Sequence, residues 1–219
     1  MYDKTILFDL DGTLIDTAEG ITKAINNTLA HFEYPYNYNK NEIIKFLGHG
    51  AHYLYQKATK KDYVDEDEMN YFIIEYVKTQ GISNLYPNVK ESLISLYQMG
   101  FELLIFSNKP NGALKYLIKD KLPDVNFLVI QGNVTEYPPK PNPALLNKIM
   151  ESNNLQPEFG YYIGDSIVDL ETAKNAKLKS IIVKSGYGNY DEINKVKPDY
   201  MVNEFKDLVS LLIKVENGD

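Results

Sequence analysis

The 219-residue sequence contains no cysteine. Disulfide bonds, thiolate zinc sites and a thiol nucleophile are therefore excluded, and cysteine usage leaves the redox compartment undetermined. The sequence also lacks an apolar run close to the roughly 18 residues that a membrane span needs. The opening residues, MYDKTILFD, are too few and too acidic for a signal peptide, so we expect a cytoplasmic protein without membrane partners.

Positive charge is scarce relative to negative charge. The chain has 23 Lys and Arg against 30 Asp and Glu, which gives a net charge of −7. A protein of this charge is a poor candidate for binding nucleic acid or an anionic membrane. The length fits one large domain, or one domain that carries a smaller insertion. The oligomeric state stays open.

Short apolar runs recur along the chain, and most of them are unbroken rather than alternating. Such runs are typical of strands that are buried on both faces of a parallel sheet. Segments with helical spacing separate the later runs, which predicts a doubly wound, Rossmann-like α/β fold. The expected strands are Thr5–Phe8, Leu103–Phe106, Phe127–Ile130, Tyr161–Ile163 and Ile181–Val183.

A long helical block follows the first expected strand. Helical periodicity alone extends from about residue 17 to residue 80, with one apolar face around Ile21 and Ile25 and another around Phe72 and Tyr76. The tract EYPYNYNKN between them is predicted as a loop because of its Pro and Asn content. We therefore expect a sheet core of residues 1–15 and 82–219 and a helical cap of residues 16–81, with linkers near 14–16 and 81–87.

Polar side chains follow several of the expected strands. In open α/β sheets, ligands bind beyond the carboxyl ends of the strands, so these side chains should meet at one edge. Lys140 lies in PPKPNP, ahead of the strand at Tyr161–Ile163. The residues that follow strands are Asp9, Asp11, Ser107, Asn108, Lys109, Asp165 and Asp169.

Each of these residues has a plain structural explanation when taken alone. Either acid of the first pair can close a turn, and the Ser-Asn and Asp-Ser pairs can cap the helices that follow them. Lys140 can be a solvated lysine. Three carboxylates at one place, however, repel by roughly 4 kcal/mol per pair at about 4 Å and an effective dielectric near 20. Such a cluster needs a cation, and oxygen ligands suit Mg²⁺.

The same cluster suits phosphate chemistry. A lysine and a hydroxyl beside the cation would bind phosphate oxygens. A carboxylate can attack phosphorus and form an aspartyl-phosphate, and a second acid two residues away can transfer the proton of the leaving group. Gly12 permits a tight turn directly after the acid pair.

The motifs DLDGT, Ser107, Lys140 and GDSIVD stand in the order found in the haloacid dehalogenase superfamily, which the chain resembles over nearly its whole length. The helical block lies where the helical-cap class of that superfamily carries its cap. The stretch SNKP, with the weaker signals GHG at Gly48–Gly50 and SGYG at Ser185–Gly188, is similar to phosphoglycolate phosphatases and related pyrophosphatases. The second acid argues against the dehalogenase branch, which lacks it.

The resemblance implies roles for the acids. Asp9 is the nucleophile and a Mg²⁺ ligand. Asp11 is the general acid and base, and its backbone carbonyl also binds Mg²⁺. Asp165 is the remaining carboxylate on the metal. Asp169 is either a further ligand or the group that fixes Lys140 or a metal-bound water.

The resemblance also implies contacts to the substrate. Ser107 and the backbone of Asn108 hold the phosphoryl group, and Lys140 neutralises its developing charge. The further predicted substrate-binding residues are Gly12, Thr13, Lys109 and two residues of the cap, Lys45 and His49. For His49 and His52, the sequence favours exposed surface positions over contact with substrate, and a histidine can serve in either.

The expected function is that of a Mg²⁺-dependent phosphatase that acts on a small, phosphoglycolate-like phosphomonoester through an aspartyl-phosphate. Three alternatives stay open. A mutase similar to β-phosphoglucomutase would return the phosphoryl group to a sugar, and a pyrophosphatase would use the same acids. A phospho-accepting receiver module also places acids, a hydroxyl and a lysine around Mg²⁺, but receivers lack the D-x-D pair and the helical block.

Overall fold

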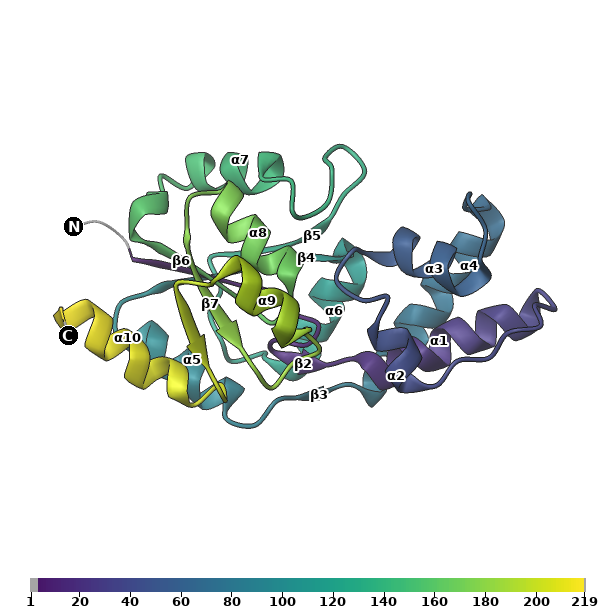
Figure 1. The fold of residues 1–219 in the computed structure, drawn as a ribbon, viewed down its shortest axis with the longest axis horizontal. Coiled ribbons are helices and arrows are strands. Elements are labelled where there is room, and N and C mark those ends of the chain that lie inside the picture. Colours follow the sequence, from purple (N-terminus) through teal and green to yellow (C-terminus); the bar gives the residue numbers. More distant parts are fainter. Residues whose placement is uncertain (1–3, 219) are drawn as a thin grey trace.

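The computed structural model describes residues 4–218, which form a sheet with helices on both faces and a cluster of helices beyond one end of it (Figure 1). The strands are β1 (Thr5–Phe8), β2 (Ile15–Asp16), β3 (Asn84–Leu85), β4 (Glu102–Pro110), β5 (Val129–Asn133), β6 (Gly160–Gly164), β7 (Lys179–Val183) and β8 (Tyr200–Val202). The α-helices are α1 (Ala18–His31), α2 (Lys40–Ile44), α3 (Ala51–Thr59), α4 (Glu66–Lys78), α5 (Val89–Gln98), α6 (Asn111–Lys121), α7 (Ala144–Ser152), α8 (Ile167–Asn175), α9 (Tyr190–Val196) and α10 (Asp207–Asn217), with 3₁₀ turns η1 (Gln80–Ile82) and η2 (Pro157–Phe159). Within this part of the chain, no helix is both long and apolar enough to cross a bilayer.

The main sheet has six parallel strands in the order β5-β4-β1-β6-β7-β8. Strand β1 lies in its middle, and alternate side chains point to opposite layers. Ile6 and Phe8 pack toward α5, α6 and α10, whereas Leu7 packs toward α7 and α8. Because all three side chains are fully buried, the strand reads as one unbroken apolar run. The predicted doubly wound fold is confirmed.

Strand β4 extends to Pro110 rather than ending at Phe106, and two further differences concern β5 and β8. Strand β5 begins at Val129 rather than at Phe127, because Phe127 lies in the preceding loop and packs only at the border of the core. Strand β8 (Tyr200–Val202) was missed: its three residues pair with β7 at the edge of the sheet, and a run this short carries little periodic signal.

Helices α1 to α4 share a hydrophobic core of their own, separate from the two layers of the sheet. Ile21 and Ile25 of α1 pack there with Tyr55 of α3 and Phe72 of α4. The segment between α1 and α2 is a loop, as predicted. Its tyrosines at positions 34, 36 and 38 lie with neighbouring ring centroids 6.4 and 6.5 Å apart and cover the edge of this core. The inserted helical cap is therefore present.

The two predicted linkers meet as a small antiparallel ribbon. Ile15 of β2 pairs with Leu85 of β3, and Asp16 pairs with Asn84. Two residues per strand are too few for a period-2 pattern, so the sequence predicted linkers but no pairing between them. The ribbon brings the start and the end of the helical block to one place beside the sheet (Figure 1).

A half-buried acid in the cap, Glu68, gives a first test of the stability of the cap. Glu68 accepts hydrogen bonds from the hydroxyls of Tyr34 and Tyr55 and from Nζ of Lys61. Burial raises the pKa of Glu68, but the hydrogen bonds from Tyr55, Lys61 and Tyr34 outweigh it and lower the pKa below its usual value. We expect Glu68→Gln to reduce the free energy of unfolding by about 1–3 kcal/mol at pH 7, as measured by urea denaturation.

The pH dependence of the stability loss shows whether it comes from the missing charge or from poor packing of the glutamine. A lowered folded-state pKa adds stability above the unfolded value, and this stability is lost as the pH falls through the folded value. The difference between wild type and Glu68→Gln should therefore be constant above about pH 5 and shrink below the unfolded pKa of 4.5. Glu66→Gln, at an exposed position of the same helix, should change stability by less than about 0.5 kcal/mol. A pH-independent difference would contradict this explanation.

Candidate active site

The acid pair lies where β1 ends, in the middle of the carboxyl edge of the sheet. The backbone N–H of Asp9 still continues the sheet and donates to the carbonyl of Ile163 at 2.9 Å. The chain then turns: the N–H groups of residues 13, 14 and 15 all donate to the carbonyl of Leu10. Gly12 has φ +88°, and a Cβ there would lie 2.5 Å from a carboxylate oxygen of Asp165. This turn needs glycine because another chain segment passes against it.

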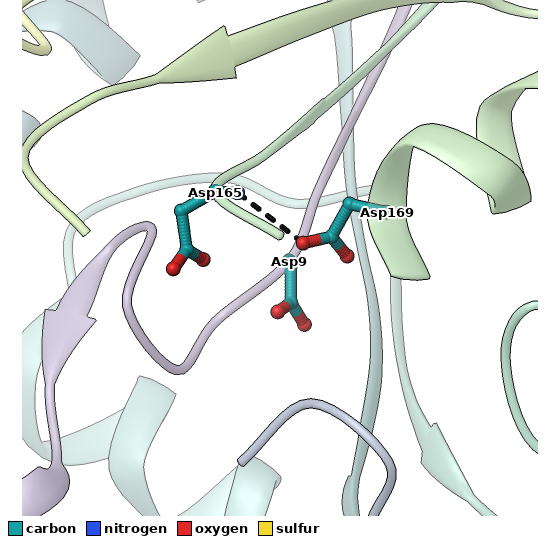
Figure 2. Close-up of side chains that lie close together, drawn as sticks. All are labelled: Asp9, Asp165 and Asp169. Carbon is teal, nitrogen blue, oxygen red and sulfur yellow. Dashed lines mark hydrogen bonds between the residues drawn. The ribbon is translucent and has the colours of Figure 1, made fainter. Parts of the chain in front are cut away.

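Three carboxylates converge at this edge, from the end of β1, from the β6–α8 connection and from the first turn of α8. Asp9, Asp165 and Asp169 each offer an oxygen, and these oxygens lie within 4.8 Å of one another (Figure 2). All three residues are at least 95% buried. Burial, together with the charges of Asp169 and Asp11, raises the pKa of Asp9 to about 6 against the pull of Lys140. Burial and the neighbouring acids also raise the pKa of Asp165 well above its usual range.

Lys140 is the cation that the structure itself supplies to this cluster. Its Nζ lies 2.9 Å from Asp9 Oδ1 and 2.7 Å from Asp169 Oδ1, and it donates to the hydroxyl of Tyr162 at 2.9 Å. Although burial opposes protonation, Asp169 and Asp9 raise the pKa of Lys140 well above its ordinary value. The explanation of Lys140 as a solvated lysine is wrong, because its side chain is only 2% exposed.

Asp169 uses both of its oxygens within the protein. One oxygen binds Lys140, and the other accepts from the backbone N–H groups of Asp165 and Ser166 and from the Ser166 hydroxyl. The Ser166 hydroxyl in turn accepts from the N–H of Asp169, which completes a capping box at the start of α8. The helix-cap explanation therefore holds for Ser166. The carboxylate of Asp169 orients Lys140 and the Asp165 backbone.

Asp165 is held by the turn that follows Asp11. The hydroxyl of Thr13 donates to Asp165 Oδ1 at 2.8 Å, and the backbone N–H of Tyr187 donates to Oδ2 at 2.7 Å. Thr13 is fully buried, and Gly12 packs against the same carboxylate. Both residues thus position an acid of the cluster, and their predicted contact with substrate stays a prediction.

The loop after β7 presses against Asp165 and gives a second test. A Cβ on Gly186 would lie 2.3 Å from the carbonyl oxygen of Gly12 and 2.3 Å from Cβ of Asp165. We expect Gly186→Ala to lower the free energy of unfolding by about 1–3 kcal/mol and to weaken divalent-cation binding about 10-fold or more. Denaturation curves and a Mg²⁺ titration of the intrinsic tyrosine fluorescence measure the two effects. Gly112→Ala, where a Cβ meets nothing within 4 Å, should do neither.

Asp11 does not belong to the three-acid cluster but faces the cap. Its Oδ1 accepts from the hydroxyl of Thr17 at 2.6 Å and from Nζ of Lys109 at 2.9 Å. Lys109 also donates to the hydroxyl of Tyr76 on α4 at 2.6 Å, and its side chain is fully buried. Burial lowers the pKa of Lys109, while Asp11 opposes this shift. One lysine thus joins the acid of the core to a tyrosine of the cap.

Ser107 and Asn108 end the central part of β4 next to Asp9. They do not cap α6, whose N-cap residue is Pro110 without a side-chain bond, so the capping explanation is wrong for this pair. The amide of Asn108 instead links three segments, because it donates to the carbonyls of Gly48 and Lys140 and accepts from the N–H of Lys140. This structural role of the side chain was not predicted.

The predicted cap contacts lie on the other side of the acids. A cavity of about 350 Å³ opens between cap and core and is lined by Lys45 and His49 together with Asp9, Asp11 and Asp165. Both cap residues therefore face the space beside the acids, and their contact with substrate stays a prediction. The Gly48–Gly50 stretch between α2 and α3 brings this part of the cap close to the acids. Its glycines have φ values of +95° at Gly48 and +90° at Gly50.

Two tyrosines at the site were not predicted. Tyr187 accepts hydrogen bonds from the N–H groups of Thr17 and Ala18 and donates to Asp16, so it ties the first linker to the Asp165 loop. It stands in the SGYG stretch, which was noticed only as a family signal. Tyr76 belongs to an apolar helix face and was read as core. The ring does pack there, but the hydroxyl reaches Lys109.

The donor set at this edge fits a hard divalent cation. Every candidate ligand is an oxygen, as Mg²⁺ and Ca²⁺ prefer. Among residues 4–218, the four acids at positions 9, 11, 165 and 169 face two buried lysines, at positions 109 and 140, which leaves two negative charges to be balanced. The raised pKa values of Asp9 and Asp165 report the same crowding.

A doubly wound sheet, an inserted helical cap and a buried acid-lysine cluster at the strand ends define a class of capped α/β enzymes. Comparison with known proteins gives the family. The model of the haloacid dehalogenase-like hydrolases matches residues 6–183. The chain belongs to this family, which confirms the resemblance seen in the motifs.

Relatives and solved structures agree over nearly the full length. A phosphoglycolate phosphatase of Aquifex aeolicus is 33% identical over 214 residues, which cover 95% of this chain and 96% of that protein. A phosphoglycolate phosphatase of Aliivibrio fischeri is 29% identical over 219 residues, with 95% and 96% covered. The crystal structure of "a predicted phosphoglycolate phosphatase" from Haemophilus somnus superposes with a TM-score of 0.83 at 29% identity and covers 96% of this chain and 98% of that one.

Proposed function

We propose that this chain is a Mg²⁺-dependent phosphatase that hydrolyses a small phosphomonoester through an aspartyl-phosphate on Asp9. The observation that carries the proposal is the arrangement of Asp9 between Lys140 and Asp165, beneath the cap and beside Asp11. The names of the relatives support phosphoglycolate as the substrate. We also propose residues 16–81 as the cap and the β2–β3 ribbon as its connection to the core.

Asp9 performs the first chemical step. One of its oxygens attacks phosphorus, the bond from phosphorus to the ester oxygen breaks, and Asp11 gives that oxygen a proton. In the second step Asp11 takes a proton from water, the water oxygen attacks phosphorus, and the bond to Asp9 breaks to release phosphate. In each step, one bond to phosphorus forms and one bond to phosphorus breaks.

Three groups of the protein position the transferred phosphoryl group. The hydroxyl of Ser107 and the backbone N–H of Asn108 lie beside Asp9 and bind phosphoryl oxygens. Lys140 balances the charge that develops on them. The carboxylates of Asp9 and Asp165 and the backbone carbonyl of Asp11 would hold Mg²⁺, which supplies further charge neutralisation when bound. Asp169 keeps Lys140 and the Ser166 hydroxyl in place through one hydrogen bond at each of its oxygens.

The proposal is tested by measuring phosphate release from a panel of phosphorylated metabolites with Mg²⁺ and with EDTA. We expect Mg²⁺-dependent release, with the highest kcat/KM for a small substrate such as phosphoglycolate. Glucose 1-phosphate serves as the arm for mutase activity. Formation of glucose 6-phosphate without free phosphate would overturn the proposal, and so would phosphate release that EDTA leaves unchanged.

A further inference from the structure

A small cavity lies between the cap and the β4 edge and shares Asp9 and Asp11 with the larger opening near Lys45. Its volume is about 30 Å³, close to that of one water molecule. Asp11, Lys109 and Tyr76 line one part of it, and the core also contributes Asp9, Ser107 and Asn108. The apolar part comes mainly from the cap: Ile21, Phe46, Leu47, Ala51 and Leu54. With the cap in this position, the cavity admits only a group of a few atoms.

Two hydrogen-bond donors on this wall remain unused. Nζ of Lys109 donates to Asp11 and to Tyr76, so one of its three N–H groups is left. The Tyr76 hydroxyl accepts from Lys109, and the hydrogen bonds within residues 4–218 include no acceptor for its own hydrogen. Tyr76 is 97% buried. Buried donors normally have a hydrogen-bond acceptor. The free N–H of Lys109 and the free O–H of Tyr76 therefore indicate that a bound ligand supplies an acceptor here.

The two unused donors limit the kind of acceptor. Asp9 and Asp11 also line the cavity, so an anionic group can bind only beside Lys109, the one cation among the described residues that line it. A carboxylate offers one oxygen to each of the two donors and donates no hydrogen bond. A second phosphoryl group carries three outer oxygens and is larger.

The position of Asp11 fixes where that carboxylate is attached. In the proposed mechanism Asp11 protonates the ester oxygen, and Lys109 Nζ lies 2.9 Å from Asp11. A carboxylate bound to Lys109 is therefore only one or two carbon atoms from the ester oxygen. We propose that Tyr76 and Lys109 form the specificity pocket of this enzyme and bind a carboxylate on the leaving group. This inference rests on the proposed function and adds Tyr76 as a specificity-determining residue.

Removing one hydroxyl tests the pocket. Tyr76→Phe keeps the ring in the cap core, so we expect the fold to survive. The probes are 2-phosphoglycolate and ethyl phosphate, which has no carboxylate. We expect wild type to prefer phosphoglycolate in kcat/KM, and Tyr76→Phe to lose about 10- to 100-fold for phosphoglycolate alone. Tyr55→Phe, which removes a buried cap hydroxyl bonded to Glu68, should leave the ratio of the two substrates unchanged.

Several outcomes would overturn the inference. An equal loss of kcat/KM for both substrates would assign Tyr76 a general role in holding cap and core together. No loss of kcat/KM for either substrate, or a wild-type preference for ethyl phosphate, would show that the pocket does not bind a carboxylate. In each of these cases phosphate release by wild type would still support the proposed function.

A binding measurement keeps the inference testable even if turnover is absent. Titration calorimetry on Asp9→Asn, with Mg²⁺ and either probe, reports affinity without chemistry. We expect phosphoglycolate to bind at least about 10-fold more tightly than ethyl phosphate, and Tyr76→Phe added to Asp9→Asn to abolish this preference. Equal affinities in Asp9→Asn would overturn the pocket independently of catalysis.

Discussion

Asp9→Asn is expected to abolish phosphate release, with a loss of about 10⁴-fold or more in kcat, while the protein stays folded. The amide has nearly the same shape as the carboxylate but cannot attack phosphorus. Circular dichroism checks the fold, and a phosphate-release assay with Mg²⁺ checks the rate. Asp120→Asn, at a half-exposed acid on α6, should keep the wild-type rate. Turnover by Asp9→Asn at more than a few per cent of that rate would contradict the role of Asp9.

The same variant should be more stable than wild type when Mg²⁺ is removed. Burial raises the folded-state pKa of Asp9 from 3.8 to about 6. A raised carboxyl pKa means that stability falls as the pH rises from about 4 to about 6 and stays low above. Since one pKa unit corresponds to about 1.4 kcal/mol, Asp9→Asn should gain about 1–3 kcal/mol in EDTA at pH 8.

Adding Mg²⁺ should reverse this order. Under the proposed function, the ion should bind the wild-type carboxylates and stabilise the folded state by mass action, whereas the amide is a weaker ligand. Thermal unfolding in EDTA and in Mg²⁺, at pH 4 and at pH 8, measures all four conditions. The explanation would be wrong if wild type were the more stable protein in EDTA at pH 8, or if Mg²⁺ raised the Tm of both proteins equally.

Lys140→Met is expected to damage stability and catalysis together. The methionine retains the length of the side chain but leaves Asp9 and Asp169 without their shared cation. Removing one partner of a buried ion pair costs about 3–5 kcal/mol, and losing a group that stabilises the transition-state charge costs about 10²–10³-fold in kcat. Urea denaturation and steady-state kinetics measure the two effects. Lys148→Met, on the exposed face of α7, is the matched control.

A second substitution separates the two consequences of losing Lys140. Asp169→Asn, added to Lys140→Met, removes the acid that the lysine had neutralised, so most of the lost stability should return. Activity should not return, because the phosphoryl group still lacks its ammonium. Recovery of activity together with stability would show that Lys140 acts only by holding the fold.

The fold and the acids of the site could be predicted because each has a local signal. Strand β1 is buried on both faces, so its four residues are all apolar or β-branched and end directly at Asp9. Asp9 and Asp11 are only two positions apart, so the sequence itself shows that they belong to one site. Topology then brings Asp165 to the same edge, since β6 pairs directly with β1.

The direction of individual side chains could not be predicted. Thr13 stands in a motif next to the acids, but the turn after Gly12 points its hydroxyl at Asp165. Tyr76 fits an apolar helix face, and only the docking of α4 against β4 reveals that its hydroxyl meets Lys109. Such contacts join residues 33 or 152 positions apart, and a single sequence carries no local trace of them.

Trapping of the phosphorylated enzyme tests the central claim most directly. Wild-type protein turning over 2-phosphoglycolate with Mg²⁺ is quenched in acid and treated with borohydride, which reduces an aspartyl-phosphate to homoserine. Peptide mass spectrometry then locates the converted residue. We predict homoserine at position 9 and none in a control without substrate. Continued phosphate release with an unmodified residue 9, or homoserine at another aspartate, would contradict the account.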